Sequence, residues 1–317
     1  MRGARFAVGA AGVATYALVP AFAPSLTYQL TVIVAMGLAA LAVSVLLRAG
    51  LISFGHALFY AAGAYAVAYF APRSGGDMLA AVMMGLACSA ALAALTALFI
   101  VRYRGIFFAM LNLALSMVAY TLLLKLYHLT GGSDGLGVTV AGFLGWGLGP
   151  AAQGEVLFYL ALVLALAAAW GVHTYLRSPA GWALSAVQDC ELRVEYLGIS
   201  ARRVLFVAYV VSGALAGLGG AMAGVAVGHI APDSAYWTTS AGFLVMAVLG
   251  GSGSIPGAFV GAALYEVLSV SAAQYLSSTW ELLLGVIIFL IIRFAPGGLL
   301  GLYDRVWQGR TARGGQP

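Results

Sequence analysis

Few side chains in this chain could carry chemistry, and those few suit the handling of protons or solutes better than covalent catalysis. The candidates are His56, which follows Ser53-Phe54-Gly55, and Glu266, which lies deep in an apolar run. The single lysine, Lys125, follows Leu123-Leu124, so the chain contains no Walker A phosphate loop. Neither a His-Glu-x-x-His zinc helix nor a Gly-x-Ser-x-Gly nucleophile turn is present. We therefore expect no enzyme activity, no metal site and no cofactor.

The sequence Ser53-Phe54-Gly55-His56 opens an apolar run with polar residues. A helix that begins at membrane depth presents unpaired N–H groups and the positive end of its dipole, which suits a substrate carboxylate or a lined cavity. The segment therefore predicts a translocation path lined by Ser53, Phe54, Gly55, His56 and Phe59. His56 itself has two interpretations, a proton carrier or a histidine hydrogen-bonded within the helix bundle.

A second interruption of an apolar run lies between Leu249 and Gly257, where glycine and serine alternate before a proline. A broken helix is tolerated in a membrane only where protein or a water-filled path covers it. Gly250, Gly251 and Ser254 are therefore further candidates for the path.

Glu266 lies about the middle of the run that follows this interruption. An ionised carboxylate at the bilayer centre costs at least ~2.5–3.5 kcal/mol on insertion scales. Glu266 is therefore either neutral or hydrogen-bonded within the bundle, or a group that titrates during transport.

Transmembrane helices must position these residues. The chain is 63% hydrophobic and 8% charged, with a mean hydropathy of +1.00, whereas an average soluble domain has roughly a quarter charged residues. A crossing helix needs about 20 apolar residues. About ten spans can be placed, over residues 6–24, 28–47, 51–71, 78–100, 106–127, 156–176, 204–227, 238–250, 256–275 and 279–294. We predict an all-α polytopic membrane protein with broken or re-entrant helices, in a single domain over residues 1–317.

The basic residues are scattered at span ends, which indicates membrane orientation and not nucleic-acid binding. If ten spans start from a cytoplasmic N-terminus, most arginines share the cytoplasmic side, and only Arg73 and Lys125 lie near the other. Both termini are then cytoplasmic. Alternatively, the first apolar run is a signal sequence cleaved near Ala21-Phe22-Ala23, which leaves nine spans and an inverted N-terminus.

Small residues within the spans predict close helix packing, with dimerisation through the same face as the alternative. The glycine series recurs at intervals of three and four residues, at Gly213, Gly217, Gly220 and Gly224. Cys88 and Cys190 fit neither a disulfide nor a metal spacing, so Cys88 is a small packing residue and Cys190 an incidental loop thiol.

The stretch from Ser178 to Ser200 is a charged island between two apolar runs, so it must lie in water. A spacing of three and four residues predicts one amphipathic helix with an apolar stripe formed by Trp182, Val187, Cys190, Val194 and Leu197. Such a helix could lie on lipid. Because three acidic residues lie in its middle, anionic lipid is a poor partner and a groove in another protein is favoured.

Taken together, these segments resemble the LivM-type permeases of bacterial ABC importers for branched-chain amino acids, over essentially the whole chain. The resemblance is carried by residues 53–57 with 63–65, 104–110, 130–135, 178–198, 249–254 and 294–301. It implies a helical fold like that of the large type II importers, in the bacterial inner membrane. It also implies a second related permease as heterodimer partner, two cytoplasmic ABC ATPase subunits and a periplasmic solute-binding protein.

In this resemblance the segment 177–203 corresponds to the cytoplasmic coupling segment that docks on the ATPases. The matching positions are Gly181, Ala183, Ala186, Glu191, Glu195, Leu197 and Gly198. This chain departs from the family where Trp182 and Gln188 stand in place of the usual arginines.

The sequence therefore favours a permease subunit of an ATP-driven importer for branched-chain amino acids or a related solute such as urea, an amide or another amino acid. The alternative is a proton-coupled secondary transporter that uses His56 and Glu266. An intramembrane enzyme is a third hypothesis, and the chain lacks the nucleophile and base that it requires.

Overall fold

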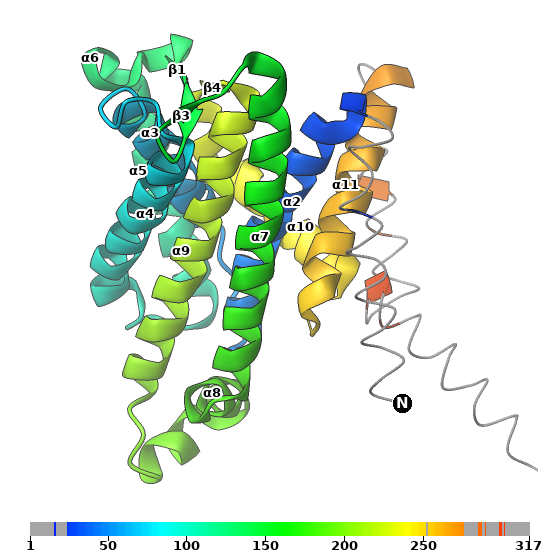
Figure 1. Cartoon of the computed structure of the whole chain (residues 1–317). Coiled ribbons are helices and arrows are strands. Elements are labelled where there is room, and N and C mark those ends of the chain that lie inside the picture. Colours follow the sequence, from blue (N-terminus) through cyan, green and yellow to red (C-terminus); the bar gives the residue numbers. More distant parts are fainter. Residues whose placement is uncertain are drawn as a thin grey trace, which may run out of the picture.

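The computed structural model describes residues 24–251 and 253–275 together with 16, 285, 286, 289, 298, 299 and 301. Long helices dominate this part of the chain (Figure 1). They are α2 (Thr27–Leu47), α3 (His56–Phe70), α4 (Met78–Ile100), α5 (Gly105–Lys125), α7 (Pro150–Arg177), α8 (Pro179–Tyr196), α9 (Ala201–Val227), α10 (Trp237–Gly250) and α11 (Ile255–Tyr275).

Five of the described helices, α2, α4, α5, α7 and α9, are long and apolar enough to cross a membrane. Their bounds agree with the predicted spans to within a few residues, except that α7 begins earlier than predicted, at Pro150. The predicted spans 6–24 and 279–294 fall almost entirely outside the described residues.

Three predicted spans take a different form. The prediction of one helix over residues 51–71 was wrong at its start, because α3 begins at His56 and has 15 residues, fewer than the roughly 20 that a crossing helix needs. α10 has 14 residues, and α10 and α11 are bent by 117° across a short break, so the pair forms one broken span or a re-entrant element. The prediction of broken or re-entrant helices is therefore confirmed at α10 and α11.

α9 runs through the centre of the bundle and packs along α2, α3 and α4 (Figure 1). Its glycines allow this approach, since a Cβ at Gly217 would clash with Ser89 and one at Gly220 would clash with the carbonyl of Tyr60. In lipid, where the surrounding chains are as apolar as the helices, such close van der Waals packing holds helices together. The glycine series is thus covered within the chain, which supports packing over dimerisation.

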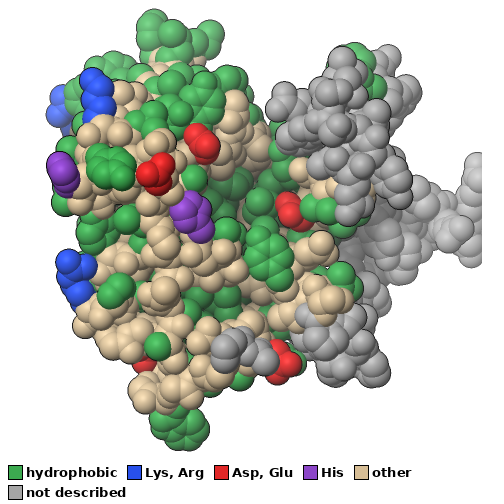
Figure 2. All heavy atoms as spheres, turned by 90° about the horizontal axis from the view of Figure 1, so that it is seen from above, with side chains coloured by type: hydrophobic (Ala, Val, Ile, Leu, Met, Phe, Trp, Pro, Cys, Tyr) green, Lys and Arg blue, Asp and Glu red, His purple; other side chains and the backbone are tan. Residues whose placement is uncertain are grey.

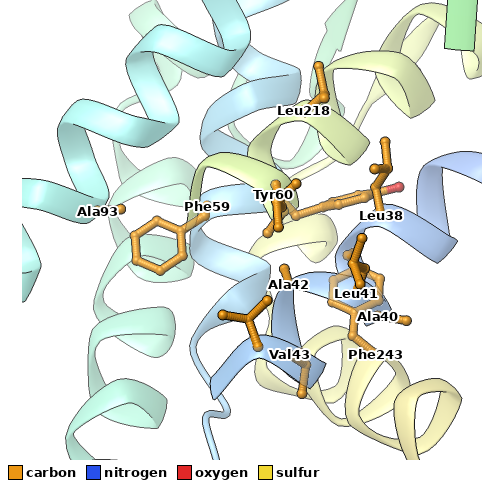
Figure 3. Close-up of a cluster of buried hydrophobic side chains, with 14 of the residues drawn as sticks. Leu38, Ala40, Leu41, Ala42, Val43, Phe59, Tyr60, Ala93, Leu218 and Phe243 are labelled. Carbon is orange, nitrogen blue, oxygen red and sulfur yellow. The ribbon is translucent and has the colours of Figure 1, made fainter. Parts of the chain in front are cut away.

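Large side chains fill the space between these helices (Figure 3). Tyr60 from α3 lies beside Leu38 from α2 and Phe243 from α10, whereas Phe59 points the other way, toward Ala93 of α4 (Figure 3), and these side chains are all buried. The rings of Tyr60 and Phe243 are 5.0 Å apart. This cluster fixes the start of α3 against α2 and α10.

Loops with short elements close the end of the bundle opposite α8 (Figure 1). They contain α6 (Tyr127–Thr130), β1 (Leu136–Gly137), β2 (Gly142–Phe143), β3 (Trp146–Gly147), β4 (His229–Ile230) and the 3-10 turns η2 (Gly132–Asp134) and η3 (Pro232–Ala235), while a further turn, η1 (Pro24–Leu26), precedes α2. β1 pairs antiparallel with β4 and β2 pairs antiparallel with β3. The Gly-rich stretch after Thr130 is therefore tied to the segment that follows α9.

Candidate translocation and coupling sites

His56 begins α3 in the interior of the bundle and is fully buried. The Ser212 hydroxyl lies 2.5 Å from His56 Nε2 and donates its single proton to the carbonyl of Ala42 at 2.7 Å. In the bond with His56 the hydroxyl oxygen is therefore the acceptor and Nε2–H the donor. His56 Nδ1 has no partner among the described residues. The geometry supports the hydrogen-bonded interpretation of His56, because its proton is held on Nε2 and bound to α9.

Two backbone N–H groups at the start of α3 donate to serine hydroxyls, one of them on another helix. The amide N–H of Ala57 donates to Ser240 Oγ of α10 at 2.8 Å, and the N–H of Gly55 donates to Ser53 Oγ at 3.3 Å. A Cβ at Gly55 would lie 2.8 Å from the carbonyl oxygen of Asn112 on α5. Four helices therefore meet the beginning of α3, namely α2, α5, α9 and α10.

The path candidates of this segment are mostly enclosed. Ser53, His56 and Phe59 are 0% exposed, Gly55 is buried, and Phe54 is half-buried. The positive end of the α3 dipole thus lies inside the protein at the level of the middle of α9. A free helix start at depth was predicted from the sequence, and its N–H groups are capped by serine side chains.

The second group of path candidates lies at the break between α10 and α11. Gly251 has a φ of 108°, a backbone conformation that glycine adopts without strain. A Cβ at Gly250 would clash with the carbonyl of Gly257, so the two helices touch through their backbones. The Ser254 hydroxyl donates to the Gly251 carbonyl at 3.3 Å. The break is a tightly packed turn, linked to α3 through α10, which carries Ser240.

Two contacts at this turn were not predicted. Arg48, just after α2, donates from Nη2 to the carbonyl of Gly253 at 2.6 Å. A Cβ at Gly298, where φ is 69°, would lie 2.5 Å from Gly251 Cα. The repeated glycines of the Pro296-Gly297-Gly298 motif were the available signal for the second contact, and no sequence signal identifies the first.

Glu266 lies on α11 and is half-buried. It makes no ion pair with the described part of the chain. The structure does not bring Glu266 and His56 together by any hydrogen bond within the described residues.

α8, the helix of the coupling segment, is divided into two pieces. Residue Cys190 has φ −163° and ψ 103°, so α8 consists of two helical pieces that meet there. The prediction of one continuous apolar stripe was wrong, because this break resets the direction in which later side chains point. Val187 and Val194 are buried against the bundle, whereas Trp182 and Leu197 are 73% and 75% exposed.

α8 packs against α7 and α9 and is bonded to the start of α5. Arg104, at the start of α5, donates from Nε and Nη2 to the two carboxylate oxygens of Glu191 at 2.8 and 2.6 Å. At the other end of α8, a Cβ on Gly181 would lie 2.5 Å from Leu176 Cα, so only glycine allows this contact. We call the Arg104–Glu191 pair the brace.

The residues predicted to couple to an ATPase fall into two groups. Gly181 and Ala183 are buried against their own chain, and Glu191 forms the brace. The exposed ones are Ala186, Glu195, Leu197 and Gly198. Gly198 has a φ of 81°, so it ends the segment in a conformation that favours glycine.

Apolar side chains are exposed at the end of the coupling segment. Leu192, Tyr196, Leu197 and Ile199 are 66%, 89%, 75% and 42% exposed, respectively. We call these four residues the apolar tip. Only Leu197 of the apolar tip belongs to the stripe predicted from the sequence. The other three residues fall outside the spacing of three and four residues that one apolar face of an unbroken helix requires.

Charges divide between the two ends of the bundle. The α8 end carries Arg48, Arg102, Arg104, Arg177, Arg193, Arg202 and Arg203 together with the acidic residues Asp189, Glu191 and Glu195, so basic residues predominate there, and the opposite end carries Arg73 and Lys125. Acidic residues Asp77, Asp134, Glu155 and Asp233 lie at that opposite end. Figure 2 looks onto this end and shows acidic and histidine side chains on a largely uncharged surface.

This fold and this division of sites define a membrane permease. Residues 25–292 match the family described as "Branched-chain amino acid transport system / permease component", and the chain belongs to that family. It is therefore a multi-pass protein of the inner membrane with the all-α architecture of the permeases of type II ABC importers.

Curated relatives agree with this family. The chain is 29% identical over 272 residues to the high-affinity branched-chain amino acid transport system permease protein LivM of Escherichia coli K12, and 28% identical over 272 residues to that of Salmonella typhimurium. Each alignment covers 79% of this chain and 64% of the relative. The permease protein LivH of Escherichia coli K12 is 32% identical over 106 residues, 33% of this chain and 34% of LivH. No solved structure matches the chain significantly.

Proposed function

We propose that this chain is the permease subunit of an ATP-driven importer for branched-chain amino acids or a related small solute such as urea, an amide or another amino acid. The observation that carries the proposal is the coupling segment, which the brace fixes to α5 while the apolar tip stays exposed. A secondary transporter has no need of such a surface. The names of the relatives point to branched-chain amino acids as the first solutes to test.

The distribution of charge supports the orientation. Because basic residues prefer the cytoplasmic side, the α8 end with its arginines is cytoplasmic, and the acidic end faces the periplasm. With α10 and α11 counted as two separate segments, as predicted, the number of spans is even and both termini lie in the cytoplasm.

The missing phosphate loop and the exposed apolar tip both indicate partner subunits. The chain has no phosphate loop of its own, so two separate cytoplasmic ABC ATPase subunits supply the energy and one of them receives the apolar tip. A second related permease completes the path, and a periplasmic binding protein delivers the solute to the acidic end.

The translocation path runs beside the start of α3 and the break between α10 and α11. Ser53 and His56 are enclosed in this structure, so solute passage along them requires α3 to move relative to α9 and α10. The serine caps from those two helices are the contacts that such a movement changes.

A proton-coupled mechanism is the alternative. His56 Nε2 is bound to a serine that is itself bound to α2, which leaves Nδ1 as the atom able to accept a proton. No carboxylate of the described residues bonds to this histidine. A proton-coupled mechanism therefore requires Glu266, which lies on α11, to carry the coupling proton.

Uptake by proteoliposomes separates the two mechanisms. The chain is reconstituted with its second permease, the ATPase subunits and the binding protein, and radiolabelled leucine is followed with ATP inside the vesicles. We expect uptake to require ATP and to continue with a protonophore. Loss of accumulation with the protonophore at constant ATP would overturn the proposal.

The variant Glu266→Gln sharpens this result, with Glu155→Gln at the exposed start of α7 as its control. A neutral amide keeps the hydrogen-bonding capacity of a structural glutamic acid, so we expect most uptake to remain in both. If Glu266→Gln abolishes accumulation and leaves exchange intact, Glu266 carries a coupling proton.

A further inference from the structure

A cavity of about 290 Å³ opens at the α8 end of the bundle, beside the turn between α10 and α11. Its walls come from three parts of the chain: the end of α2, the last turns of α7 and the beginning of α11. The lining residues are Arg48, His173, Leu176, Arg177, Gly253, Ile255 and Pro256. None of the functions described above uses this cavity.

The cavity is basic. Arg48, His173 and Arg177 line it, and no carboxylate is found among the described residues of its walls. Arg48 follows the end of α2, and partial burial lowers the pKa of its guanidinium by removing water from the charge. One of its nitrogens bonds to the Gly253 carbonyl. Two arginines that pair with no carboxylate of the described residues, at a recess, provide a site for an anion.

The surroundings of the cavity are those of a lipid. On its inner side the cavity borders closely packed, largely apolar side chains of α2 and α7, among them Leu41, Val45 and Val172. On α7, Trp170 lies three and seven residues before His173 and Arg177, so the three share one helix face. Trp170 is 72% exposed, and an exposed tryptophan near the end of a span is typical of the headgroup level.

We propose that this cavity binds the headgroup of an anionic phospholipid. Basic pockets between transmembrane helices on the cytoplasmic side are suited to such headgroups. The assignment to the inner leaflet rests on the orientation in the proposed function, whereas the binding chemistry does not. A lipid here contacts the end of α7, one residue before the N-cap of α8, and the turn held by Arg48. It therefore joins the coupling segment to the broken helix pair.

Native mass spectrometry of the full chain in mild detergent tests the proposal. Dioleoyl-phosphatidylglycerol is titrated, with dioleoyl-phosphatidylcholine as the uncharged-headgroup comparison and inorganic phosphate as competitor. We expect one saturable phosphatidylglycerol per chain that phosphatidylcholine does not replace. Each of Arg48→Gln and Arg177→Gln should weaken binding about fivefold, and the double variant about 25-fold.

Arg102→Gln is the matched control, since Arg102 is an exposed arginine at the same end and does not line the cavity. Arg48→Lys keeps the charge and should retain most binding, because Arg48→Gln is expected to fail through loss of that charge. Equal binding by Arg177→Gln, the Arg102 control and the unsubstituted chain would overturn the site. Displacement by millimolar inorganic phosphate would overturn the lipid and assign a free anion. Neither outcome bears on ATP-driven uptake, which is measured separately.

Discussion

The centre of the bundle and the coupling segment are held in place by different kinds of contact. Around α9, backbones touch directly at Gly217 and Gly220, and buried side chains fill what remains. α8 packs on α7 and α9 through buried side chains, among them Val187 and Val194, and is bonded to the start of α5 by the brace, an ion pair that is about one-third exposed, while its apolar tip faces outward. A methyl group added at Gly220 therefore has to displace the backbone of α3. The residues of the apolar tip are exposed, so their substitution should affect transport before it affects folding.

The largest expected effect is at Gly220. In Gly220→Ala the new methyl group meets the Tyr60 carbonyl, which belongs to the backbone and cannot rotate away. Overpacking costs about 1–3 kcal/mol where side chains can adjust, and contact with a backbone allows less adjustment. We expect a marked loss of folded, monodisperse protein on size-exclusion chromatography. Gly171→Ala is the control, since nothing lies near that position, and comparable yields from both would refute the importance of the α9 contact.

The next largest effect is at the apolar tip. Tyr196→Asp combined with Leu197→Asp places two charges on a surface that has to become desolvated in an interface. We expect more than a tenfold loss of ATPase co-purification and of uptake, with the thermal unfolding temperature unchanged. Trp146→Asp, at an exposed aromatic of the opposite end, should leave co-purification intact. A lower unfolding temperature of the tip variant would show that the apolar tip contributes to folding, which would contradict the contrast between the tip and the centre of the bundle.

A smaller effect is expected at the brace. Arg104 and Glu191 are each about one-third exposed, and ion pairs of this kind contribute about 0.2–1 kcal/mol. Arg104→Gln and Glu191→Gln should each reduce uptake a few-fold, and the double variant should be no worse than the more severe single variant. Additive losses in this double-mutant cycle, measured as initial uptake rates, would show that the two residues act independently.

Long apolar runs made most of the fold predictable. The bounds of α2, α4 and α9 were placed closely, because a crossing helix has a length fixed by the bilayer and few other structures satisfy its backbone there. The polar Ser53–His56 sequence likewise predicted a helix start at membrane depth, and α3 begins at His56. These features depend on neighbouring residues only.

Features that depend on distant residues could not be predicted. Arg104 and Glu191 are 87 positions apart, and Arg48 and Gly253 are 205 apart, so their pairing follows from how the helices pack. The prediction of one continuous apolar stripe on α8 was wrong for a related reason. A helix advances by 100° per residue only while its dihedral angles persist, and the extended conformation of Cys190 ends that regularity.

The central claim is that the apolar tip lies in the cytoplasm against an ATPase. Leu197→Cys, in a chain with Cys88 and Cys190 replaced, tests it through a membrane-impermeant thiol reagent and a short bifunctional cross-linker. We expect no labelling in intact cells, labelling after permeabilisation, and a cross-link to the ATPase subunit, whereas Trp146→Cys should label in intact cells and form no such cross-link. Labelling of Leu197→Cys in intact cells, or a cross-link no stronger than that of Trp146→Cys, would contradict the account.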